Sequence, residues 1–374
     1  MTGPGRTHDV EARVEEVTAR AYEVPTDRPE SDGTLEWDST TIVVVEVSAG
    51  DRRGIGYTYG HRAITEVVSA TLAPLVTGMD ALAPPAAWVA MQRAVRNIGR
   101  QGLCAMAISA LDIALWDLRA KLLDLSLADS LGRFREAIPA YGSGGFTSYT
   151  DAELAEQLRG WVEQGCERVK IKVGREPGRE PGRDPERLAA AREAIGDEIA
   201  LMVDANGAFD HRAAARQAAR YAEFGVSYFE EPVSSDDLDG LRWLRDAVPA
   251  GIEVAAGEYA WDLDELERLA GCVDVLQADA TRCGGITNVL RADGICRARN
   301  LPFSAHCAPQ VSAHLCCAME RAVHVEYFHD HSRVESMLFD GALSLEDGEL
   351  RPDRSRPGLG IELKRAEAER LSAS

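Results

Sequence analysis

The sequence predicts an α/β protein in which a β/α barrel follows a smaller α+β region. From about residue 138, short apolar strands alternate with helical segments, giving eight strands and seven intervening helices. Before that point the strands come first and the helices after, a pattern typical of an α+β domain. A polar residue ends most barrel strands. The chain length of 374 residues accommodates one barrel and one further domain.

The α+β region opens with segments of mixed character. Val10 to Tyr22 combines charges with valines and could hold a first strand, whereas the polar, Pro/Gly-punctuated segment from Pro25 to Gly33 predicts a loop. The β-branched run Thr40 to Ser48 and the returning run Gly54 to Tyr59 predict a hairpin. Three helices are expected next, over Ala63 to Leu75, Ala86 to Ile98 and Leu103 to Leu123.

The barrel elements follow in strict alternation. The expected strands are Ile138 to Tyr141, Val169 to Val173, Ile199 to Val203, Ser227 to Phe229, Glu253 to Ala256, Val273 to Gln277, Pro302 to Ser304 and His324 to Tyr327. The expected helices are Asp151 to Gln164, Pro185 to Ile195, His211 to Phe224, Asp236 to Ala247, Leu263 to Ala270, Ile286 to Asn300 and Val311 to Glu320. The tail lacks this rhythm, and we expect it to return to the first domain. The expected domains are therefore residues 1–135, 136–340 and 341–374.

The strand from Val169 to Val173 carries two lysines. Its apolar residues face one side, and Lys170 and Lys172 face the other. A lysine pair in a buried strand is costly unless an anionic group lies opposite. An amphipathic edge strand with solvated lysines is the alternative interpretation, but the residues that end the other strands favour a buried site.

Polar residues end the second to eighth barrel strands. They are Lys172, Asp204, Glu230, Glu258, Asp279, His306 and Glu326. Their spacing of 20 to 32 residues corresponds to one strand and one helix each. Because the carboxyl ends of barrel strands meet at one mouth, these side chains should lie side by side around it.

Three neighbouring carboxylates, Asp204, Glu230 and Glu258, offer hard oxygen ligands that suit Mg²⁺. A single one of them would as readily be a helix N-cap or a surface acid. His306 beside Asp279 forms a plausible acid/base dyad, because a carboxylate fixes the histidine tautomer and raises its basicity. Lys172 can act as a base where burial and nearby cations lower its pKa.

Composition excludes several classes of function. A net charge of −20 argues against binding nucleic acid or anionic membranes. No apolar run is long enough to span a bilayer, and Met1 to Arg6 lacks the apolar core of a secretory signal. The eight cysteines show no C-x-x-C spacing, so reduced, buried thiols in a cytoplasmic protein are expected. The tandem repeat of Arg-Glu-Pro-Gly over residues 175–182 predicts a neutral duplication in a solvated loop.

The segments around these strand ends resemble the enolase superfamily, in its mandelate racemase subgroup of mandelate racemase/muconate lactonizing enzyme-like proteins. They are Val169-Lys170-Ile171-Lys172, Val203-Asp204-Ala205-Asn206, Phe229-Glu230-Glu231-Pro232, Gly257-Glu258, Ala278-Asp279 with Gly284-Gly285, Ser304-Ala305-His306 and His324-Val325-Glu326. Leu111 to Asp117 is similar to the helix that leads into the barrel in this family.

The resemblance implies a modified (β/α)7β TIM-type barrel with an N-terminal α+β capping domain that the tail completes. It implies Mg²⁺ held by Asp204, Glu230 and Glu258, Lys172 as the base on one face of the substrate, and His306 with Asp279 on the other. It further implies that Lys170, Glu326 and Asn206 contact the substrate. Muconate cycloisomerase and dipeptide epimerase relatives have a lysine where this chain has Asp279, which argues against those two activities.

The chemistry implied by the family is removal of a proton α to a carboxylate. Dehydration of a sugar acid to a 2-keto-3-deoxy acid is favoured by analogy, and a racemase, epimerase or cycloisomerase is the alternative. A non-catalytic sugar-acid binder is a third, which the intact set of bases and metal ligands opposes. We expect a small carboxylate substrate and a homo-oligomer. Candidates to meet substrate hydroxyls are Arg28, Trp37, Arg282 and Gln310.

Overall fold

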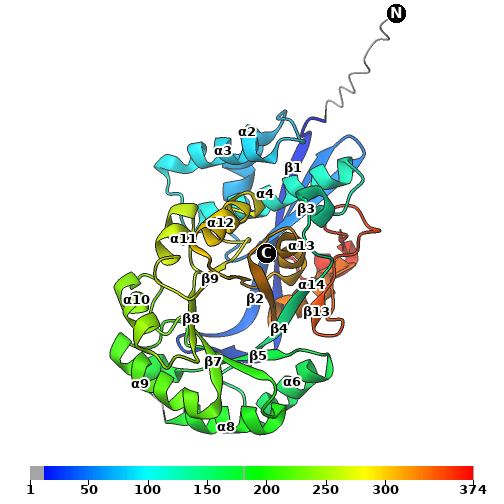
Figure 1. Cartoon of the computed structure of the whole chain (residues 1–374). Coiled ribbons are helices and arrows are strands. Elements are labelled where there is room, and N and C mark those ends of the chain that lie inside the picture. Colours follow the sequence, from blue (N-terminus) through cyan, green and yellow to red (C-terminus); the bar gives the residue numbers. More distant parts are fainter. Residues whose placement is uncertain (1–11, 180–181, 374) are drawn as a thin grey trace, which may run out of the picture.

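The chain folds into a three-stranded antiparallel sheet with its helices and a closed parallel barrel, as the computed structural model shows (Figure 1). The structure describes residues 12–179 and 182–373. The segment Met1 to Arg6, for which we predicted no secretory signal, lies outside the described residues, as do residues 180–181 of the repeated segment. Among the described residues, no helix is both long and apolar enough to cross a bilayer.

The first sheet has the order β1 (Glu16–Ser31), β2 (Glu36–Ala49) and β3 (Arg52–Tyr59), with antiparallel neighbours. The long helix α4 (Leu103–Leu122) packs against it. Glycines on β3 permit this close approach: a Cβ at Gly56 would lie 2.1 Å from the Ala110 carbonyl oxygen. The predicted hairpin is confirmed, and so is the helix predicted over Leu103 to Leu123.

The prediction of a loop over Pro25 to Gly33 is wrong for most of that segment, because β1 continues to Ser31. The pairing with β2 shifts its register between Pro25 and Glu30. Since β1 is an edge strand, its prolines need not donate to a second neighbour, and the shift absorbs the misfit. The polar residues of this segment therefore reflect its position on an edge strand, and they do not interrupt the strand.

The helices of the first region are more segmented than predicted. The first comprises α1 (Ile64–Glu66), a π-helical turn η1 (Val67–Leu72) and α2 (Ala73–Val76). The second is α3 (Pro84–Ala94) followed by the turn η2 (Val95–Asn97). A short helix, α5 (Leu127–Leu131), was not predicted.

Eight parallel strands close the barrel, because β11 pairs with β4. They are β4 (Ile138–Gly144), β5 (Arg168–Lys172), β6 (Ala200–Asp204), β7 (Val226–Glu230), β8 (Glu253–Ala256), β9 (Val275–Ala278), β10 (Phe303–Ala305) and β11 (Ala322–Phe328). Each overlaps a predicted strand, so the predicted fold class is confirmed.

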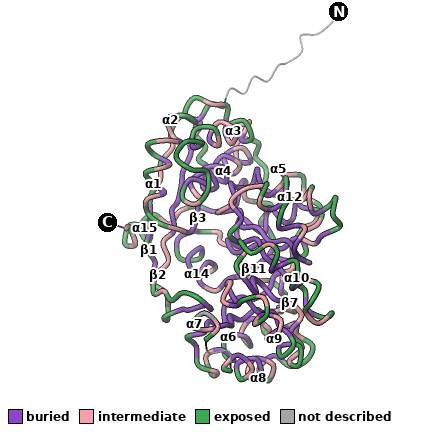
Figure 2. Tube along the Cα trace, turned by 90° about the vertical axis from the view of Figure 1, so that its left-hand side faces the viewer, coloured by how far each residue is buried: buried purple, intermediate pink, exposed green. Residues whose placement is uncertain are grey.

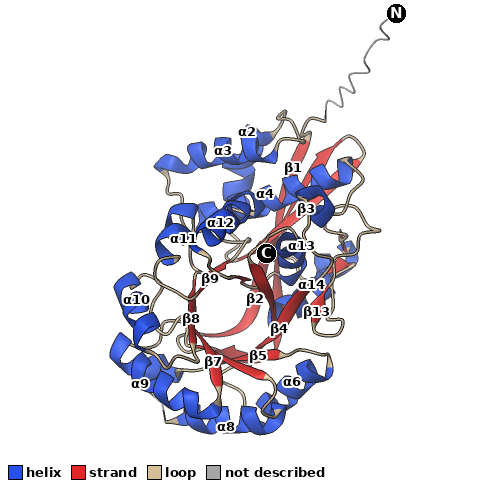
Figure 3. Ribbon diagram, in the orientation of Figure 1, coloured by secondary structure: helices blue, strands red, loops and turns tan. Residues whose placement is uncertain are grey.

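Helices surround the barrel on its outside (Figure 3). They are α6 (Asp151–Glu163), α8 (Arg183–Ile195), α9 (His211–Tyr221) with the turn η3 (Ala222–Phe224), α10 (Leu238–Ala247), α11 (Leu263–Leu269), α12 (Ile286–Arg299), α13 (Pro309–Cys317) and α14 (His329–Leu338). A short helix, α7 (Arg175–Gly178), precedes α8.

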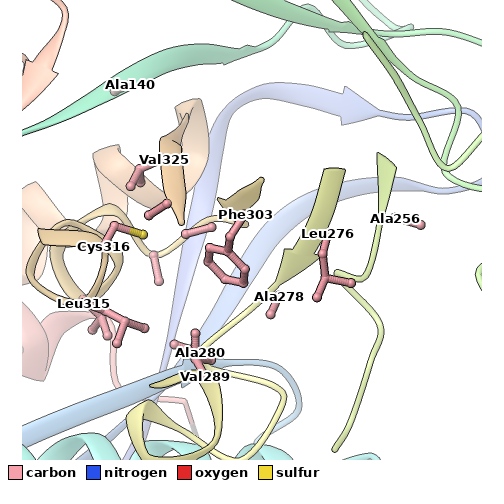
Figure 4. Packing of buried hydrophobic residues seen from close by; sticks show 14 of the residues in the cluster. Ala140, Ala256, Leu276, Ala278, Ala280, Val289, Phe303, Leu315, Cys316 and Val325 are labelled. Atoms are coloured by element: carbon pink, nitrogen blue, oxygen red, sulfur yellow. The ribbon is translucent and has the colours of Figure 1, made fainter. Parts of the chain in front are cut away.

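The main apolar core lies between the strands and this outer layer. Buried side chains on the outward strand faces, such as Leu276 and Phe303, pack there with helix residues such as Leu315 (Figure 4). The purple interior of Figure 2 follows the strands, and green marks the outer helical surface. The eight cysteines are all buried and none forms a disulfide.

The tail contacts both parts of the protein. Its strand β13 (Glu349–Leu350) pairs with β4, and β14 (Glu362–Leu363) pairs with β12 (Phe339–Asp340). After α15 (Arg365–Arg370), the carbonyl of Leu371 accepts a hydrogen bond from the Glu23 amide at 2.8 Å. The division at residues 135 and 340 stays a prediction.

A buried carboxyl joins the capping sheet to the barrel helices. Glu335 on α14 accepts hydrogen bonds from the Tyr57 hydroxyl on β3 and, at 3.1 Å, from the Gln310 amide on α13. Burial raises the pKa of Glu335 to about 8, against the lowering effect of these donors. The folded protein therefore keeps a proton on Glu335 at neutral pH, whereas the unfolded chain, with an ordinary pKa of 4.5, does not.

We predict that Glu335→Gln changes the pH dependence of stability. Because the folded-state pKa exceeds the unfolded-state pKa, Glu335 favours folding fully below pH 4.5, and this contribution is lost as pH rises to about 8. The loss is at most about 5 kcal/mol. Glutamine does not titrate. The free energy of unfolding of the variant minus that of the wild type, measured in urea titrations, should therefore increase from pH 5 to pH 8. A difference between Glu335→Gln and the wild type that stays constant from pH 5 to pH 8 would contradict the assignment.

Candidate active site

A cavity of about 260 Å³ opens at the barrel mouth beneath the capping sheet. Lys172, Asn206, Glu258 and His306 line it from the barrel, and Trp37 lines it from β2. This volume is near the lower end for small-molecule sites. A larger hollow of about 430 Å³ elsewhere contains none of the strand-end residues, so the chemistry is placed at the barrel mouth.

The barrel register brings the predicted site residues together. Lys172 pairs with Asp204, and Asp204 pairs with Glu230, so these three lie on adjacent strands at one level. Glu258 follows β8 by two residues, and His306 follows β10 by one. Beyond the strand ends the backbone turns sharply, with positive φ at the non-glycine residues Asn206, Glu231 and Cys307. Such strained positions gather at functional sites.

Both lysines of β5 are paired with carboxylates. The Lys172 ammonium lies 2.5 Å from Asp204 Oδ2. The Lys170 ammonium, fully buried, donates to Glu230 and lies 2.8 Å from Glu326 Oε1. The prediction that an anionic group faces these lysines is therefore confirmed, and the solvated edge strand is excluded.

His306 bridges two carboxylates. Its Nδ1 lies 2.9 Å from Asp279 Oδ2 and its Nε2 lies 3.0 Å from Glu258 Oε2. Asp279 is itself held by the amide and hydroxyl of Thr281, at 2.6 and 2.7 Å. The hydrogen bond to Asp279 fixes the ring orientation of His306, as predicted, whereas the approach of Nε2 to Glu258 Oε2 is an ion pair without hydrogen-bond geometry.

The basic groups hold their protons. Burial opposes the positive charge on Lys170, but Glu230 and Glu326 outweigh it and hold its pKa well above the ordinary value. Burial likewise opposes the charge on Lys172, and Asp204 raises its pKa. Burial lowers the pKa of His306, and the acidic side chains around the ring raise it well above its usual range. Each proton carrier is therefore charged and paired with an acid.

The carboxyl groups of the site fall into two classes, according to whether their surroundings raise or lower their pKa. Burial and the nearby Asp204 raise the pKa of Glu230 well above its ordinary value, and burial with Glu258 does the same for Glu231. Burial would also raise the pKa of Glu258 and Glu326, but His306 lowers the first and Lys170 the second. Glu230 and Glu231 thus lack sufficient positive charge among the side chains around them.

The residues present fit a divalent cation with oxygen ligands. Six buried carboxyl groups share the site with three basic side chains and His306. These acids are Asp204, Glu230, Glu231, Glu258, Asp279 and Glu326, and the bases are Lys170, Lys172 and Arg282. Glu230 Oε1 is buried without a hydrogen-bond partner, and so is Asn206 Oδ1. Unpartnered carboxylate oxygens in an acid-rich pocket are the donors that Mg²⁺ prefers.

Of the four residues predicted to meet substrate hydroxyls, two line the cavity and two do not. Trp37 and Arg282 line the cavity, and Arg282 lies 3.7 Å from Glu258 Oε1. Arg28 instead pairs with Glu153 at 3.2 Å near the surface. Gln310 is buried away from the cavity lining, where its amide donates to the Leu359 carbonyl at 2.6 Å and stabilises the tail.

Several cavity residues were missed by sequence reasoning. Tyr59, Phe328 and His331 line the cavity, and the Cys307 amide donates to Glu326 Oε2 at 3.1 Å. Cys307 follows His306 directly, so its position at a strand end was a usable signal. Tyr59 was not singled out as a residue, although we expected substrate specificity to lie in part in the hairpin near Tyr57 to His61, which contains it.

The capping segment after β1 presses directly on the barrel. A Cβ at Gly33 would lie 2.5 Å from the Ala205 carbonyl oxygen and 2.8 Å from that of Val173. The Thr147 hydroxyl donates to the Asp32 carbonyl at 2.7 Å and fixes the same segment. The cavity is therefore covered by a backbone-to-backbone contact that only glycine allows at this position.

Two family descriptions match the chain. Residues 15–132 match the mandelate racemase / muconate lactonizing enzyme N-terminal domain, and residues 153–368 match the enolase C-terminal domain-like family.

Individual relatives agree with these matches. The L-talarate/galactarate dehydratase of Salmonella typhimurium is 32% identical over 86% of this chain and 80% of its own length. Its structure with Mg and L-lyxarohydroxamate has a TM-score of 0.89 at 29% identity, covering 100% of this chain and 96% of that chain. The 3,6-anhydro-alpha-L-galactonate cycloisomerase of Streptomyces coelicolor is 29% identical over 94% of this chain and 97% of its own length. A mandelate racemase/muconate lactonizing enzyme-like protein from Rubrobacter xylanophilus is 60% identical, with a TM-score of 0.94, covering 96% of this chain and 100% of that chain.

We predict that Gly33→Ala lowers kcat/KM by about 10- to 100-fold, because the methyl group displaces the capping segment from the strand ends. The free energy of unfolding should fall by only about 1–3 kcal/mol. The matched control is Gly160→Ala on α6, where a Cβ meets nothing within 4 Å. It should leave kcat/KM unchanged and raise the free energy of unfolding by about 0.5–1 kcal/mol, because alanine is favoured over glycine in a helix interior. Steady-state kinetics and urea unfolding check the pair; equal kcat/KM for the two variants would show that the contact does not shape the cavity.

Proposed function

The chain belongs to the mandelate racemase and muconate lactonizing enzyme family of the enolase superfamily, and from this premise we propose that it dehydrates a sugar acid to a 2-keto-3-deoxy acid. The observation that carries the proposal is the convergence of Lys172, His306 and an acid-rich oxygen cluster on one covered cavity. Relatives named as dehydratases of galactarate, arabinonate and gluconate support the choice of substrate class.

Asp204, Glu230 and Glu258 are the proposed ligands of Mg²⁺. Bound there, the cation supplies electrostatic stabilisation of the negative charge that develops on the substrate carboxylate when the α-proton leaves. Structures of relatives are named with bound magnesium. Lys170 adds a fixed positive charge beside Glu230 and Glu326, and Asn206 offers an unpartnered amide oxygen at the cavity wall.

Lys172 and His306 are the proposed proton-transfer groups. In the dehydration, one base removes the α-proton, the electron pair of that C–H bond forms a C=C bond, and the β-hydroxyl leaves as water after accepting a proton. His306 is charged, hydrogen-bonded to Asp279 and paired with Glu258, which suits the acid that protonates the leaving hydroxyl. Lys172 would then be the group that takes the α-proton. The enol product loses its hydroxyl proton, gains a proton at the β-carbon and becomes the 2-keto acid.

To take the α-proton, Lys172 must first lose its own. Burial opposes the charge on its ammonium group, but Asp204 raises its pKa, contrary to the lowered pKa that we expected. A cation held by Asp204 would engage that carboxylate and add positive charge beside the ammonium group, and both effects would lower the pKa of Lys172.

An isomerase is the second candidate, favoured by the relatives named as cycloisomerases of galactarolactone and of 3,6-anhydrogalactonate. The same two groups could deliver and remove protons on opposite faces of one carbon. Dehydration yields a keto acid, whereas racemisation or ring opening and closing yields an isomer of the substrate.

The chain should act in the cytoplasm as a homo-oligomer without a nucleic-acid partner. The net charge of −20 opposes nucleic-acid binding, and the buried cysteines suit a reducing compartment.

A screen of sugar acids with Mg²⁺ tests the function directly. Each acid is incubated in deuterated water, and the 2-keto product and α-deuterium incorporation are measured together. A 2-keto product supports the dehydratase. Deuterium without a keto product selects the isomerase, and neither signal with any acid contradicts both.

We predict that Glu230→Gln lowers turnover on the order of 1,000-fold, because the amide removes a negative charge from the proposed metal cluster. Magnesium affinity, measured by calorimetry, should fall in parallel, and the far-ultraviolet circular dichroism spectrum should stay unchanged. The exposed control Glu198→Gln should retain both activity and magnesium affinity. Unaltered magnesium affinity in Glu230→Gln would place the cation elsewhere.

We predict that Lys172→Ala and His306→Asn separate the two proton transfers, each lowering product formation by about 100- to 10,000-fold. In deuterated water, His306→Asn should still exchange the α-proton, because Lys172 remains as the base. Lys172→Ala should lose exchange and product together. In an isomerase, each variant should exchange only the stereoisomer that faces its surviving base. Proton NMR reads both outcomes; wild-type exchange and product formation in both variants would remove these residues from the mechanism.

A further inference from the structure

A second cluster of potential metal ligands lies outside the cavity, where β1 meets the start of α14. Its members are Asp27 and Glu30 on β1 and His329 at the first position of α14. His329 Nε2 lies 3.2 Å from each carboxylate oxygen of Asp27. One oxygen of Glu30 completes a set whose ligand atoms all lie within 4.8 Å of one another.

Glu30 distinguishes this cluster from an ordinary surface ion pair. Glu30 is only 1% exposed, and its Oε2 accepts a hydrogen bond from Trp37 Nε1 at 2.9 Å. Its Oε1 is buried without any hydrogen-bond partner. A buried carboxyl oxygen without a donor is costly, so this oxygen calls for a proton or a cation. Burial, with the nearby Asp330 and Asp27, raises the pKa of Glu30 to about 8.

The charged neighbours on α14 make their hydrogen bonds elsewhere, although Arg333 Nε is buried without a hydrogen-bond partner. Arg333 donates to Asp330 and to the Pro25 carbonyl, both at 2.7 Å. Asp330 also accepts from the Thr40 hydroxyl. Arg333 lowers the pKa of Glu30 only as a minor influence behind burial and the two aspartates. Asp27, Glu30 and His329 therefore keep their ligand atoms directed at one another.

We propose that Asp27, Glu30 and His329 form a second cation site, selective for a divalent transition ion of the zinc class. One imidazole and two carboxylates suit Zn²⁺, whereas Mg²⁺ prefers oxygen ligands alone. Ligand atoms about 2.0–2.1 Å from a tetrahedral ion are roughly 3.3 Å apart, and the separation of His329 Nε2 from Asp27 is 3.2 Å. Water completes the fourth position.

Occupancy of this site ties the capping sheet to the barrel. Asp27 and Glu30 belong to β1, whereas α14 follows the last barrel strand directly. Trp37, bonded to Glu30, lines the active-site cavity. The ion therefore stiffens one wall of the cavity and stabilises its cover without contacting the reacting atoms.

Zinc stoichiometry tests the site in the full chain without an affinity tag. The other two potential ligand clusters among the described residues both contain His306, so His306→Asn serves as the background. With excess Mg²⁺ present, equilibrium dialysis should give one Zn²⁺ per background chain. Adding His329→Asn to this background should reduce the bound Zn²⁺ to nearly zero per chain. The matched control His211→Asn, a partly exposed histidine at the start of α9, should keep one Zn²⁺.

Amide hydrogen exchange tests whether the ion links the capping sheet to the barrel. Zn²⁺ should slow amide hydrogen exchange between Pro25 and Trp37 in the background chain but not after His329→Asn. If that variant does not fold, Asp27→Asn, which alters a side chain 43% exposed, replaces it. A background chain that binds no Zn²⁺ overturns the proposal and leaves a protonated Glu30 as the explanation of the cluster. Equal Zn²⁺ binding with and without His329 overturns it as well.

Discussion

The structure depends on the compensation of buried charge at the barrel mouth. Lys170 has no exposed surface, and it is stable there only because Glu230 and Glu326 contact its ammonium group. Removing one partner of such a pair leaves an uncompensated charge and costs about 3–5 kcal/mol. Asp204, Glu258 and Asp279 follow the same rule, since Asp204 contacts Lys172, and Glu258 and Asp279 contact His306. The catalytic groups are therefore held in place by the electrostatics that also gives them their proton affinities.

The capping segment is held over the strand ends by close backbone contacts and, among the described residues, not by ion pairs. Gly33 brings the capping segment against the carbonyls of Ala205 and Val173, and Thr147 holds that segment from the barrel side. Tyr57 and Glu335 join the two parts further back. Excluding water strengthens each electrostatic interaction inside the cavity. Cap and charge cluster thus act together, because the pairs in the barrel mouth are strong only while the cavity is covered.

The barrel and its charged residues could be predicted because one strand and one helix repeat along the chain. That repeat places Asp204, Glu230 and Glu258 at equivalent positions without any knowledge of long-range contacts. The capping contributions have no such repeat. Tyr59 reaches the cavity through the pairing of β3 with β2, and Asp27 meets His329 across 302 positions of sequence. The strand over Pro25 to Ser31 was missed because its polar residues matched a loop, while its pairing with β2 decided the structure.

The proposed preference for dehydration over isomerisation is supported by how differently Lys172 and His306, the proposed proton-transfer groups, are held. Asp279 fixes His306 by a hydrogen bond at Nδ1, so the second ring nitrogen, Nε2, is oriented toward Glu258 and the cavity. Lys172 ends a flexible side chain, and a single close carboxylate, Asp204, holds its ammonium group. Racemisation needs two groups that serve one carbon equally well from opposite faces. Dehydration needs unequal groups, a mobile base at the α-carbon and a fixed acid at the leaving hydroxyl. The unequal support of Lys172 and His306 therefore favours elimination of water over inversion of a single centre.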